Sequence, residues 1–315
     1  MKKIAVLIPC YNEEKTIKKV VMDFKKELPE AQIYVYNNNS TDNSLKILNE
    51  IEGIVVRNEY NQGKGNVVRR MFREIDADIY VMVDGDDTYP AEEVHKLIEP
   101  IAEGKADMTV GDRLSNGTYK NENKRAFHQL GNSIVKNSIN FLFKTDLKDI
   151  MSGYRAFNKL FVKNISILSP KFEIETEITL SALDKRFIIQ EIPIIYRDRP
   201  QGSVSKLNTI QDGIKVTKTI LKMYKDYKPR KFFFFITFIF FIIGIVFGAP
   251  VVAEFINTKY ITKIPSAILA TGLMMISAIS FQSGVILDTI VKANKEKYEL
   301  NLLRYEEREK SKNEK

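Results

Sequence analysis

The sequence is most informative at Asp78-Ile79-Tyr80-Val81-Met82-Val83-Asp84-Gly85-Asp86-Asp87. Its apolar run is typical of a strand covered on both faces, as in a parallel sheet. The run ends in three carboxylates within four residues, and clustered carboxylates repel one another unless a cation lies among them. The stretch alone also fits a polar turn, because Asp-Gly is a common turn signal. Hard oxygen ligands at the carboxyl end of a strand favour a site for Mg²⁺ or Mn²⁺.

Strand and helix patterns alternate on both sides of this stretch, over residues 1–115. The apolar spacing predicts strands at 4–8, 33–36, 54–56, 79–83 and 108–110. It predicts helices at 13–28, 42–49, 66–75 and 91–102. This order is typical of an α/β fold with a doubly wound, mostly parallel sheet. Ligands of such sheets lie outside the carboxyl ends of the strands, where the polar segments at 9–13, 37–42 and 84–87 meet.

The pattern is mixed from about residue 116 to residue 230. We expect helices at 125–143 and 172–183, a strand at 187–195, and a lysine-rich amphipathic helix at 207–227. A basic amphipathic helix just before an apolar segment is typical of a membrane surface, although a plain surface helix has the same pattern. We therefore expect the helices at 125–143 and 207–227 to lie at a membrane interface.

Two later segments, 232–252 and 264–287, contain no charged residue. Each is long enough to cross a bilayer core of about 30 Å at about 1.5 Å per residue. Two successive runs of this length favour a transmembrane hairpin over a buried hairpin of a soluble protein. Lysines and arginines flank both outer ends, so the positive-inside rule places these ends in the cytoplasm. We expect a multi-pass protein of the cell membrane.

These segments divide the chain into four parts. We expect a cytoplasmic α/β domain at 1–205, a membrane-surface helix at 206–231, the hairpin at 232–290, and a charged cytoplasmic tail at 291–315 that forms a frayed surface helix. No cleavable signal peptide is expected, because Met1-Lys2-Lys3 leads straight into a short strand.

The composition narrows the classes of partner. The formal net charge is +8, which suits nucleic acid, anionic lipid or phosphorylated substrates. Nucleic acid is disfavoured because the carboxylate cluster would repel its phosphates and no nucleic-acid motif is present. The chain has one cysteine, Cys10, so it cannot form an internal disulfide.

Three more polar motifs accompany the carboxylates, each weak alone. Tyr11 and Glu13 follow the first strand and suit stacking on a base and hydrogen bonding to a nucleoside, although an acidic residue also favours a helix start. The asparagines after the second strand suit a pyrimidine edge or a turn. Lys64, between two glycines at a helix start, suits phosphate oxygens. The Walker A spacing is absent, so a P-loop ATPase is not supported.

Taken in order and spacing, these motifs resemble those of family-2 inverting glycosyltransferases. The matching segments are Pro9-Cys10-Tyr11-Asn12-Glu13, Asn38-Asn39-Ser40-Thr41-Asp42, Asn61-Gln62-Gly63-Lys64-Gly65, Asp84-Gly85-Asp86, Met151-Ser152-Gly153-Tyr154-Arg155, Glu175-Thr176-Glu177 and the run from Arg199 to Lys206. The set is similar to the branch that makes polyprenyl-phosphate sugars, including dolichol-phosphate mannose synthases and bacterial undecaprenyl-phosphate sugar transferases. The resemblance implies a GT-A fold, a nucleotide-sugar donor, a polyprenyl-phosphate acceptor and, by kinship alone, a homo-oligomer that is a tetramer.

The same resemblance implies roles for individual residues. Asp84 and Asp86 look like the pair that holds the metal and the diphosphate, and Arg199 like a catalytic residue of the closing loop. The other expected contacts to the nucleotide sugar are Pro9, Tyr11, Glu13, Asn38, Asp42, Lys64, Ser205 and Lys206. The expected contacts to the lipid phosphate are Arg113, Lys124, Arg125 and His128. Glu175 and Glu177 stand where relatives carry acidic residues near the acceptor. There they would act as a base or position the sugar, although a role in structural ion pairs fits them equally.

Two departures bear on the donor. Asn37 and Asn38 stand where the family usually has two acidic residues, and Thr88 and Tyr89 stand where mannose synthases usually carry Gln and His. We therefore expect UDP-GlcNAc or UDP-Glc. The alternatives are a mannosyltransferase that uses GDP-mannose, a transferase that elongates a lipid-linked glycan, and an inactive scaffold for a flippase. The chain has no Trp, which argues against the Gln-x-x-Arg-Trp motif of processive synthases.

Overall fold

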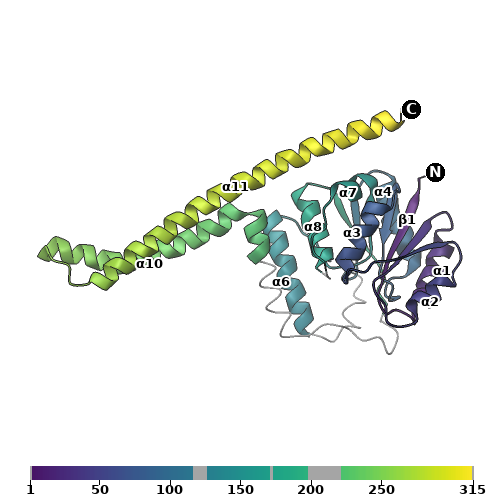
Figure 1. Ribbon diagram of the computed structural model, residues 1–315, viewed down its shortest axis with the longest axis horizontal. Helices are drawn as coiled ribbons and strands as arrows, with labels where there is room; N and C mark the ends of the chain where they lie inside the picture. The colour runs from purple at the N-terminus through teal and green to yellow at the C-terminus, as the bar shows by residue number, and fades with distance from the viewer. Residues whose placement is uncertain (1, 116–125, 171–172, 198–220, 314–315) are drawn as a thin grey trace. The chain divides into compact units, whose positions relative to one another are not determined.

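The computed structural model describes residues 2–115, 126–170, 173–197 and 221–313, with the backbone alone at 126–132 and 312–313. The chain forms two compact units, Met1–Asp212 and Gly213–Lys315. The first is an α/β unit and the second is a pair of long helices (Figure 1).

A seven-stranded sheet forms the centre of the first unit, in the order β3-β2-β1-β4-β6-β5-β7. Its strands are β1 (Ile4–Cys10), β2 (Gln32–Asn37), β3 (Ile54–Asn58), β4 (Ile79–Met82), β5 (Met108–Asp112), β6 (Arg155–Asn158) and β7 (Ile189–Pro193). All neighbouring strands pair in parallel except at β6, which is antiparallel to β4 and β5. The predicted doubly wound, mostly parallel sheet is confirmed.

Helices cover both faces of the sheet (Figure 1). One apolar core includes residues of α1 (Ile17–Glu27), α2 (Ser44–Asn49) and α4 (Val94–Ala102). The other includes residues of α3 (Lys64–Glu74), α7 (Lys159–Asn164) and α8 (Ile174–Asp184). Strand side chains alternate between the cores, so β1 is apolar along its length and needs a cover on each side. The short helix η1 (Ala91–Glu93) precedes α4, and α6 is Ala126–Phe143.

Strand β6 was not predicted from the sequence. It is four residues long and begins with Arg155, a residue type that is rarely buried in a strand. Arg155 nevertheless lies opposite Met82 in the antiparallel ladder with β4. This pairing brings the turn before β6 beside the end of β4, where the carboxylates begin.

Helix α1 begins at Ile17 rather than at residue 13 as predicted. The backbone N–H groups of Asn12 and Glu13 donate to Ser40 Oγ at 3.0 Å and to Ser44 Oγ at 2.8 Å. The next N–H, of Glu14, donates to Asp42 Oδ2 at 3.1 Å. Side chains of Ser40, Ser44 and Asp42 thus accept hydrogen bonds from the N–H groups of residues 12–14, and the helix starts after this segment.

The second unit contains α10 (Pro229–Thr258) and α11 (Ile264–Asn313), which pack against each other as an antiparallel pair. Ser277 Oγ donates to the Thr237 carbonyl oxygen at 3.0 Å. Glycines allow close approach, since a Cβ at Gly244 would meet Met274 and one at Gly284 would meet Phe233. Both helices are long and apolar enough to cross a membrane. The expected helical hairpin is therefore present.

The charged end of the chain differs from the expected frayed helix. Helix α11 continues without a break to Asn313. Opposite charges one turn apart support it, as in the pair of Lys292 and Asp288 at 3.1 Å.

Candidate active site

The polar segments predicted to meet do so at the carboxyl edge of the sheet. In the ladder of β1 and β2, Pro9 lies opposite Tyr36 and Cys10 lies opposite Asn37. The N–H of Asn38 donates to the Cys10 carbonyl at 2.8 Å. On the other side, the Thr16 hydroxyl donates to the Gly85 carbonyl at 2.7 Å. The loops after β1, β2 and β4 are thereby joined.

A lysine lies between two carboxylates at the end of β4. Lys64 Nζ is 2.5 Å from Asp84 Oδ1 and 2.5 Å from Glu175 Oε1. The side chains of Lys64 and Glu175 are 9% and 8% exposed, and that of Asp84 is 29% exposed. Burial alone would lower the pKa of Lys64, but the two carboxylates raise it well above its ordinary value. Lys64 therefore compensates the negative charges of Asp84 and Glu175.

The three carboxylates after β4 have different partners. Asp86 is buried and accepts hydrogen bonds from the Thr88 hydroxyl at 2.6 Å and the Thr88 N–H at 3.3 Å. Asp87 has a positive φ of 59° and forms an ion pair with Lys19 at 2.6 Å. The predicted cluster is thus divided. Asp87 pairs with Lys19, so Asp84 and Asp86 are the two carboxylates that could share a ligand.

These two carboxylates fit a divalent ion whose other ligands come from a bound molecule. In the part of the chain that the structure describes, no group of three or more His, Cys, Asp or Glu residues could hold a metal ion. Mg²⁺ in particular is commonly bound by one or two carboxylates together with substrate phosphates. The donor set therefore suits a metal that binds with a diphosphate.

Gly153 and Tyr89 support Asp84, and the sequence had assigned them no such role. A Cβ on Gly153 would overlap Asp84 Oδ2, so this position has no room for a side chain. The Gly153 N–H donates to the Tyr89 hydroxyl at 3.0 Å. Tyr89 is buried, and burial raises the pKa of its hydroxyl above the ordinary value. The motif containing Gly153 was visible in the sequence, but its contact depends on the unpredicted strand β6.

A buried guanidinium lies behind this turn. Arg155 is fully buried and donates to the carbonyls of Ile150 at 2.5 Å and Ser152 at 2.8 Å, and to the Thr179 hydroxyl at 2.9 Å. Burial lowers the pKa of Arg155 to about 10, and the negative charge of Glu175 opposes that shift. Arg155 holds the turn at 150–152 in place beside Asp84.

The two glutamates of α8 have different surroundings. Glu175 contacts Lys64, whereas the Glu177 carboxylate accepts from the N–H groups of Leu168 and Ser169, both at 2.8 Å. The loop that Glu177 holds packs on the start of α3, where a Cβ on Gly65 would overlap the Ser169 carbonyl. Glu177 therefore supports the backbone beside Lys64 rather than facing the same site.

Two residues predicted to contact the nucleoside are engaged with the backbone. Asn38 Nδ2 donates to the carbonyls of Glu59 and Asn61, both at 2.9 Å, and Asn38 Oδ1 accepts from the Gly63 N–H at 2.6 Å. Asp42 accepts from the N–H groups of Glu14 and Ser44. Burial would raise the pKa of Asp42, but these hydrogen bonds lower it below the ordinary value. Both residues shape the loops of the site.

The match to protein families is direct. The model of glycosyl transferase family 2 matches residues 5–165, just over half of the chain. This chain belongs to glycosyltransferase family 2.

Relatives of this glycosyltransferase include proteins named for polyprenyl phosphates. The UDP-N-acetylglucosamine–dolichyl-phosphate N-acetylglucosaminyltransferase of Methanococcus voltae is 28% identical over 248 residues, covering 70% of this chain and 96% of its own length. The dolichol-phosphate mannosyltransferase of Pyrococcus furiosus is 29% identical over 213 residues, covering 65% of this chain and 59% of its own length.

A solved structure supports the GT-A fold of the glycosyltransferase. The glucosyl-3-phosphoglycerate synthase of Mycobacterium tuberculosis, in complex with Mn²⁺, UDP-glucose and phosphoglyceric acid, superposes with a TM-score of 0.54. The superposition covers 71% of this chain and 79% of the synthase at 17% identity. The expected fold is thus confirmed, and divalent metals occur with UDP sugars in this fold.

The residues expected to bind the lipid phosphate are only partly described. Arg113 Nε and Nη2 donate to the two carboxylate oxygens of Asp149 at 2.7 and 2.8 Å, and its guanidinium lies over the Tyr196 ring at 5.4 Å from the centroid. His128 lies on α6, where only the backbone is described. Lys124 and Arg125 lie outside the described residues, as do Arg199, Ser205 and Lys206, which were expected at the donor.

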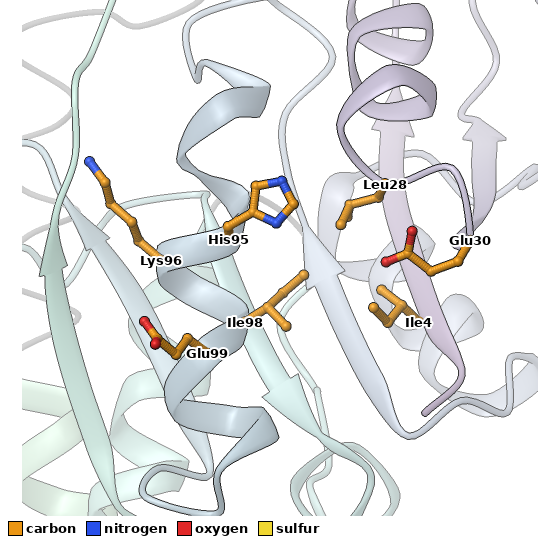
Figure 2. Close-up of a pocket in the computed structure, with 7 residues that line it drawn as sticks. All are labelled: Ile4, Leu28, Glu30, His95, Lys96, Ile98 and Glu99. Atoms are coloured by element: carbon orange, nitrogen blue, oxygen red, sulfur yellow. The ribbon is translucent and has the colours of Figure 1, made fainter. Parts of the chain in front are cut away.

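A separate hollow of about 430 Å³ lies at the opposite end of the sheet. Figure 2 shows Ile98 of α4 facing Leu28 and Ile4 across it. Ile4 is the first residue of β1, so this hollow is at the amino ends of the strands. The candidate site described above lies at their carboxyl ends and is distinct from this hollow.

Proposed function

We propose that this glycosyltransferase transfers a sugar from a nucleotide sugar to the phosphate of a polyprenyl phosphate, with inversion at the anomeric carbon. The observation that carries the proposal is the ion-paired group of Lys64, Asp84 and Glu175 at the carboxyl end of β4. This group places an ammonium group beside a carboxylate. We propose that the first binds the departing diphosphate and that the second helps to hold its metal ion.

The chemistry requires more help for the leaving group than for the nucleophile. A lipid phosphate is already anionic at neutral pH, since its second pKa is about 6. Mg²⁺ or Mn²⁺ held by Asp86 and Asp84 would neutralise charge on the diphosphate. Lys64, with Arg199, Ser205 and Lys206, binds the diphosphate oxygens. Attack from the opposite face of the sugar gives the inverted product.

The hairpin explains how the enzyme meets this acceptor. Transferring an isoprenoid tail into water would cost about 0.8 kcal/mol per CH₂ group, so the catalytic unit must work at the membrane surface. We propose that α10 and α11 anchor it as a multi-pass hairpin in the cell membrane. Basic residues at 222–231 and 292–297 support a cytoplasmic position for the catalytic unit, by the positive-inside rule. The anionic leaflet attracts the net charge of +8.

We propose UDP-GlcNAc or UDP-Glc as the donor. The relative from Methanococcus is named for UDP-N-acetylglucosamine, whereas the relative from Pyrococcus is named for mannose. Thr88 and Tyr89 depart from the residues usual in mannose synthases, which supports the UDP sugars. Transfer from GDP-mannose is the alternative donor specificity.

A donor screen tests the proposal. The full chain in detergent is given undecaprenyl phosphate and Mn²⁺ with labelled UDP-GlcNAc, UDP-Glc or GDP-mannose, and the lipid-linked sugar is extracted. We expect product from a UDP sugar and loss of product with EDTA. The test variant is Asp86→Asn, which keeps the size of the side chain and should lower kcat/KM by about 10³ or more. Product from GDP-mannose alone would exclude the UDP donors, and sugar added only to a lipid-linked glycan would exclude the polyprenyl-phosphate acceptor.

A further inference from the structure

We propose that Lys64 is an internal counter-ion that occupies the metal side of Asp84 until the donor arrives, so that the divalent ion binds only together with the nucleotide diphosphate. The inference rests on the proposed function in that the donor is a nucleotide sugar. It assigns Lys64 two successive partners: first the carboxylates of Asp84 and Glu175, then the diphosphate.

The position of the ammonium group is the first argument. Lys64 Nζ lies 2.5 Å from Asp84 Oδ1, so it occupies the place next to this oxygen that a metal ligand must offer to its ion. An ammonium group and a divalent ion beside the same carboxylate oxygen repel each other, and the double charge of the ion strengthens that repulsion. A free metal ion is therefore disfavoured while Lys64 holds this position. A diphosphate brings the negative charge that lets both cations stay.

The fixed backbone around Lys64 is the second argument. On one side, the Gly63 N–H donates to Asn38 Oδ1 at 2.6 Å. On the other side, the Gly65 N–H donates to the Pro170 carbonyl at 3.1 Å. The backbone at Lys64 is held from both sides, so the exchange of partners requires rotation of the lysine side chain and no movement of the loop.

The role of Glu175 follows from the same contacts. It holds Lys64 Nζ at 2.5 Å and thereby sets where the ammonium group lies relative to Asp84. The buried guanidinium of Arg155 interacts electrostatically with Glu175. The Glu175 charge therefore keeps a favourable partner when Lys64 turns to the diphosphate. Glu175 acts through Lys64 and is a positioning residue.

A pair of binding measurements on Lys64→Met tests the proposal. The substitution keeps a long, flexible side chain but removes the charge. Binding of Mn²⁺ to the full chain in detergent is followed without nucleotide by the electron paramagnetic resonance signal of free Mn²⁺. Binding of UDP and of GDP with Mn²⁺ is followed by calorimetry. We expect Mn²⁺ affinity without nucleotide to rise tenfold or more, and affinity for the preferred nucleotide diphosphate to fall tenfold or more.

The expected rise in Mn²⁺ affinity and fall in nucleotide affinity distinguish this proposal from simpler roles of Lys64. A lysine that only binds phosphate would leave Mn²⁺ affinity without nucleotide unchanged, and a lysine that only supports the fold would lower both affinities; either result overturns the proposal. Glu175→Gln is the second variant, since Lys64 keeps its contact to Asp84 there. Its Mn²⁺ affinity without nucleotide should not rise, and a rise would contradict the exchange.

The matched control is Lys163→Met. Lys163 is also a partly buried lysine, but it donates to the carbonyls of Phe72 and Ile75, so Mn²⁺ affinity should stay unchanged. Neither readout needs an acceptor or sugar transfer. If the donor screen gives no product but Lys64→Met changes both affinities as expected, only the proposed acceptor is rejected. If the screen gives product but Lys64→Met leaves Mn²⁺ affinity unchanged, only the proposed counter-ion role of Lys64 is rejected.

Discussion

The catalytic unit and the helical hairpin differ in how far they expose apolar side chains of the same type. Phe157 in β6 is 0% exposed, whereas Phe235 in α10 is 65% exposed. In the sheet, apolar side chains alternate between two covered faces, which is how water drives an α/β unit to fold. In α10 the apolar side chains surround the helix, which is typical of a segment whose surroundings are themselves apolar. The comparison shows that aromatic side chains of the same type are buried in the catalytic unit and exposed along α10.

The largest expected effect comes from truncating one aromatic side chain in each region. Phe157→Ala removes a fully buried ring and should cost about 3–5 kcal/mol of unfolding free energy. Thermal unfolding of the full chain in detergent, followed by the signal of the α/β unit, measures the loss. The control Phe235→Ala should leave that transition within about 0.5 kcal/mol. Equal losses would mean that the exposed ring of the hairpin also packs in a water-driven core.

The second test uses the single cysteine of the catalytic unit. Cys10 is 1% exposed, and burial, with added repulsion from Glu13, raises its thiol pKa from 9.0 to about 12. A raised pKa depletes the thiolate, so at pH 8 about one molecule in 10⁴ is ionised, about a thousandfold fewer than in the unfolded chain. Ellman's reagent should therefore react with native Cys10 about a thousandfold more slowly than in denaturant.

A cysteine in the hairpin loop provides the contrast for this measurement. Tyr260 is 76% exposed, so Tyr260→Cys in a Cys10→Ala background should react at the rate of a free thiol. Fast reaction of native Cys10 would show that the end of β1 is open to water, contrary to the packing of the catalytic unit.

The third test places a charge on the hairpin. Ile242 is near the middle of α10 and 42% exposed, so Ile242→Arg should cost about 2.5–3.5 kcal/mol of membrane insertion. The fraction of protein that resists alkaline extraction from membranes should fall, while Ile242→Leu should keep it. Unchanged extraction of the arginine variant would place α10 outside the hydrocarbon.

Sequence patterns predicted the elements that depend on local periodicity. The apolar runs of β1 and β4 and the uncharged spans of α10 and α11 are properties of consecutive residues, so they are visible without the fold. Strand β6 is short and begins with the charged Arg155, and its place depends on pairing with distant strands. Its contact to Asp84 through Gly153 could not be predicted for the same reason.

The site illustrates the same limit. Asp84, Lys64 and Glu175 were each identified from their motifs, but their mutual contact joins α3, β4 and α8, which no local pattern connects. Asn38 and Glu177 were expected at the substrates, yet their hydrogen bonds go to loop backbone. An amide or a carboxylate suits either task, because both tasks need the same donors and acceptors.

The smallest test compares one kind of hydrogen bond in the two regions. Thr16 in the catalytic unit donates its hydroxyl to the buried Gly85 carbonyl at 2.7 Å, and Ser277 in the hairpin donates to the Thr237 carbonyl at 3.0 Å. Thr16→Val keeps the shape, leaves a buried acceptor without this donor, and should cost about 1–3 kcal/mol. Ser277→Ala should cost about 0.6 kcal/mol, because the chain unfolded within a membrane finds other partners for its polar groups. Denaturant unfolding of the α/β signal measures the first, and helix-pair dissociation in detergent measures the second. A larger loss of stability for Ser277→Ala than for Thr16→Val would contradict this prediction. It would mean that the hydrogen bond of Ser277, and not close packing at Gly244 and Gly284, holds α10 and α11 together.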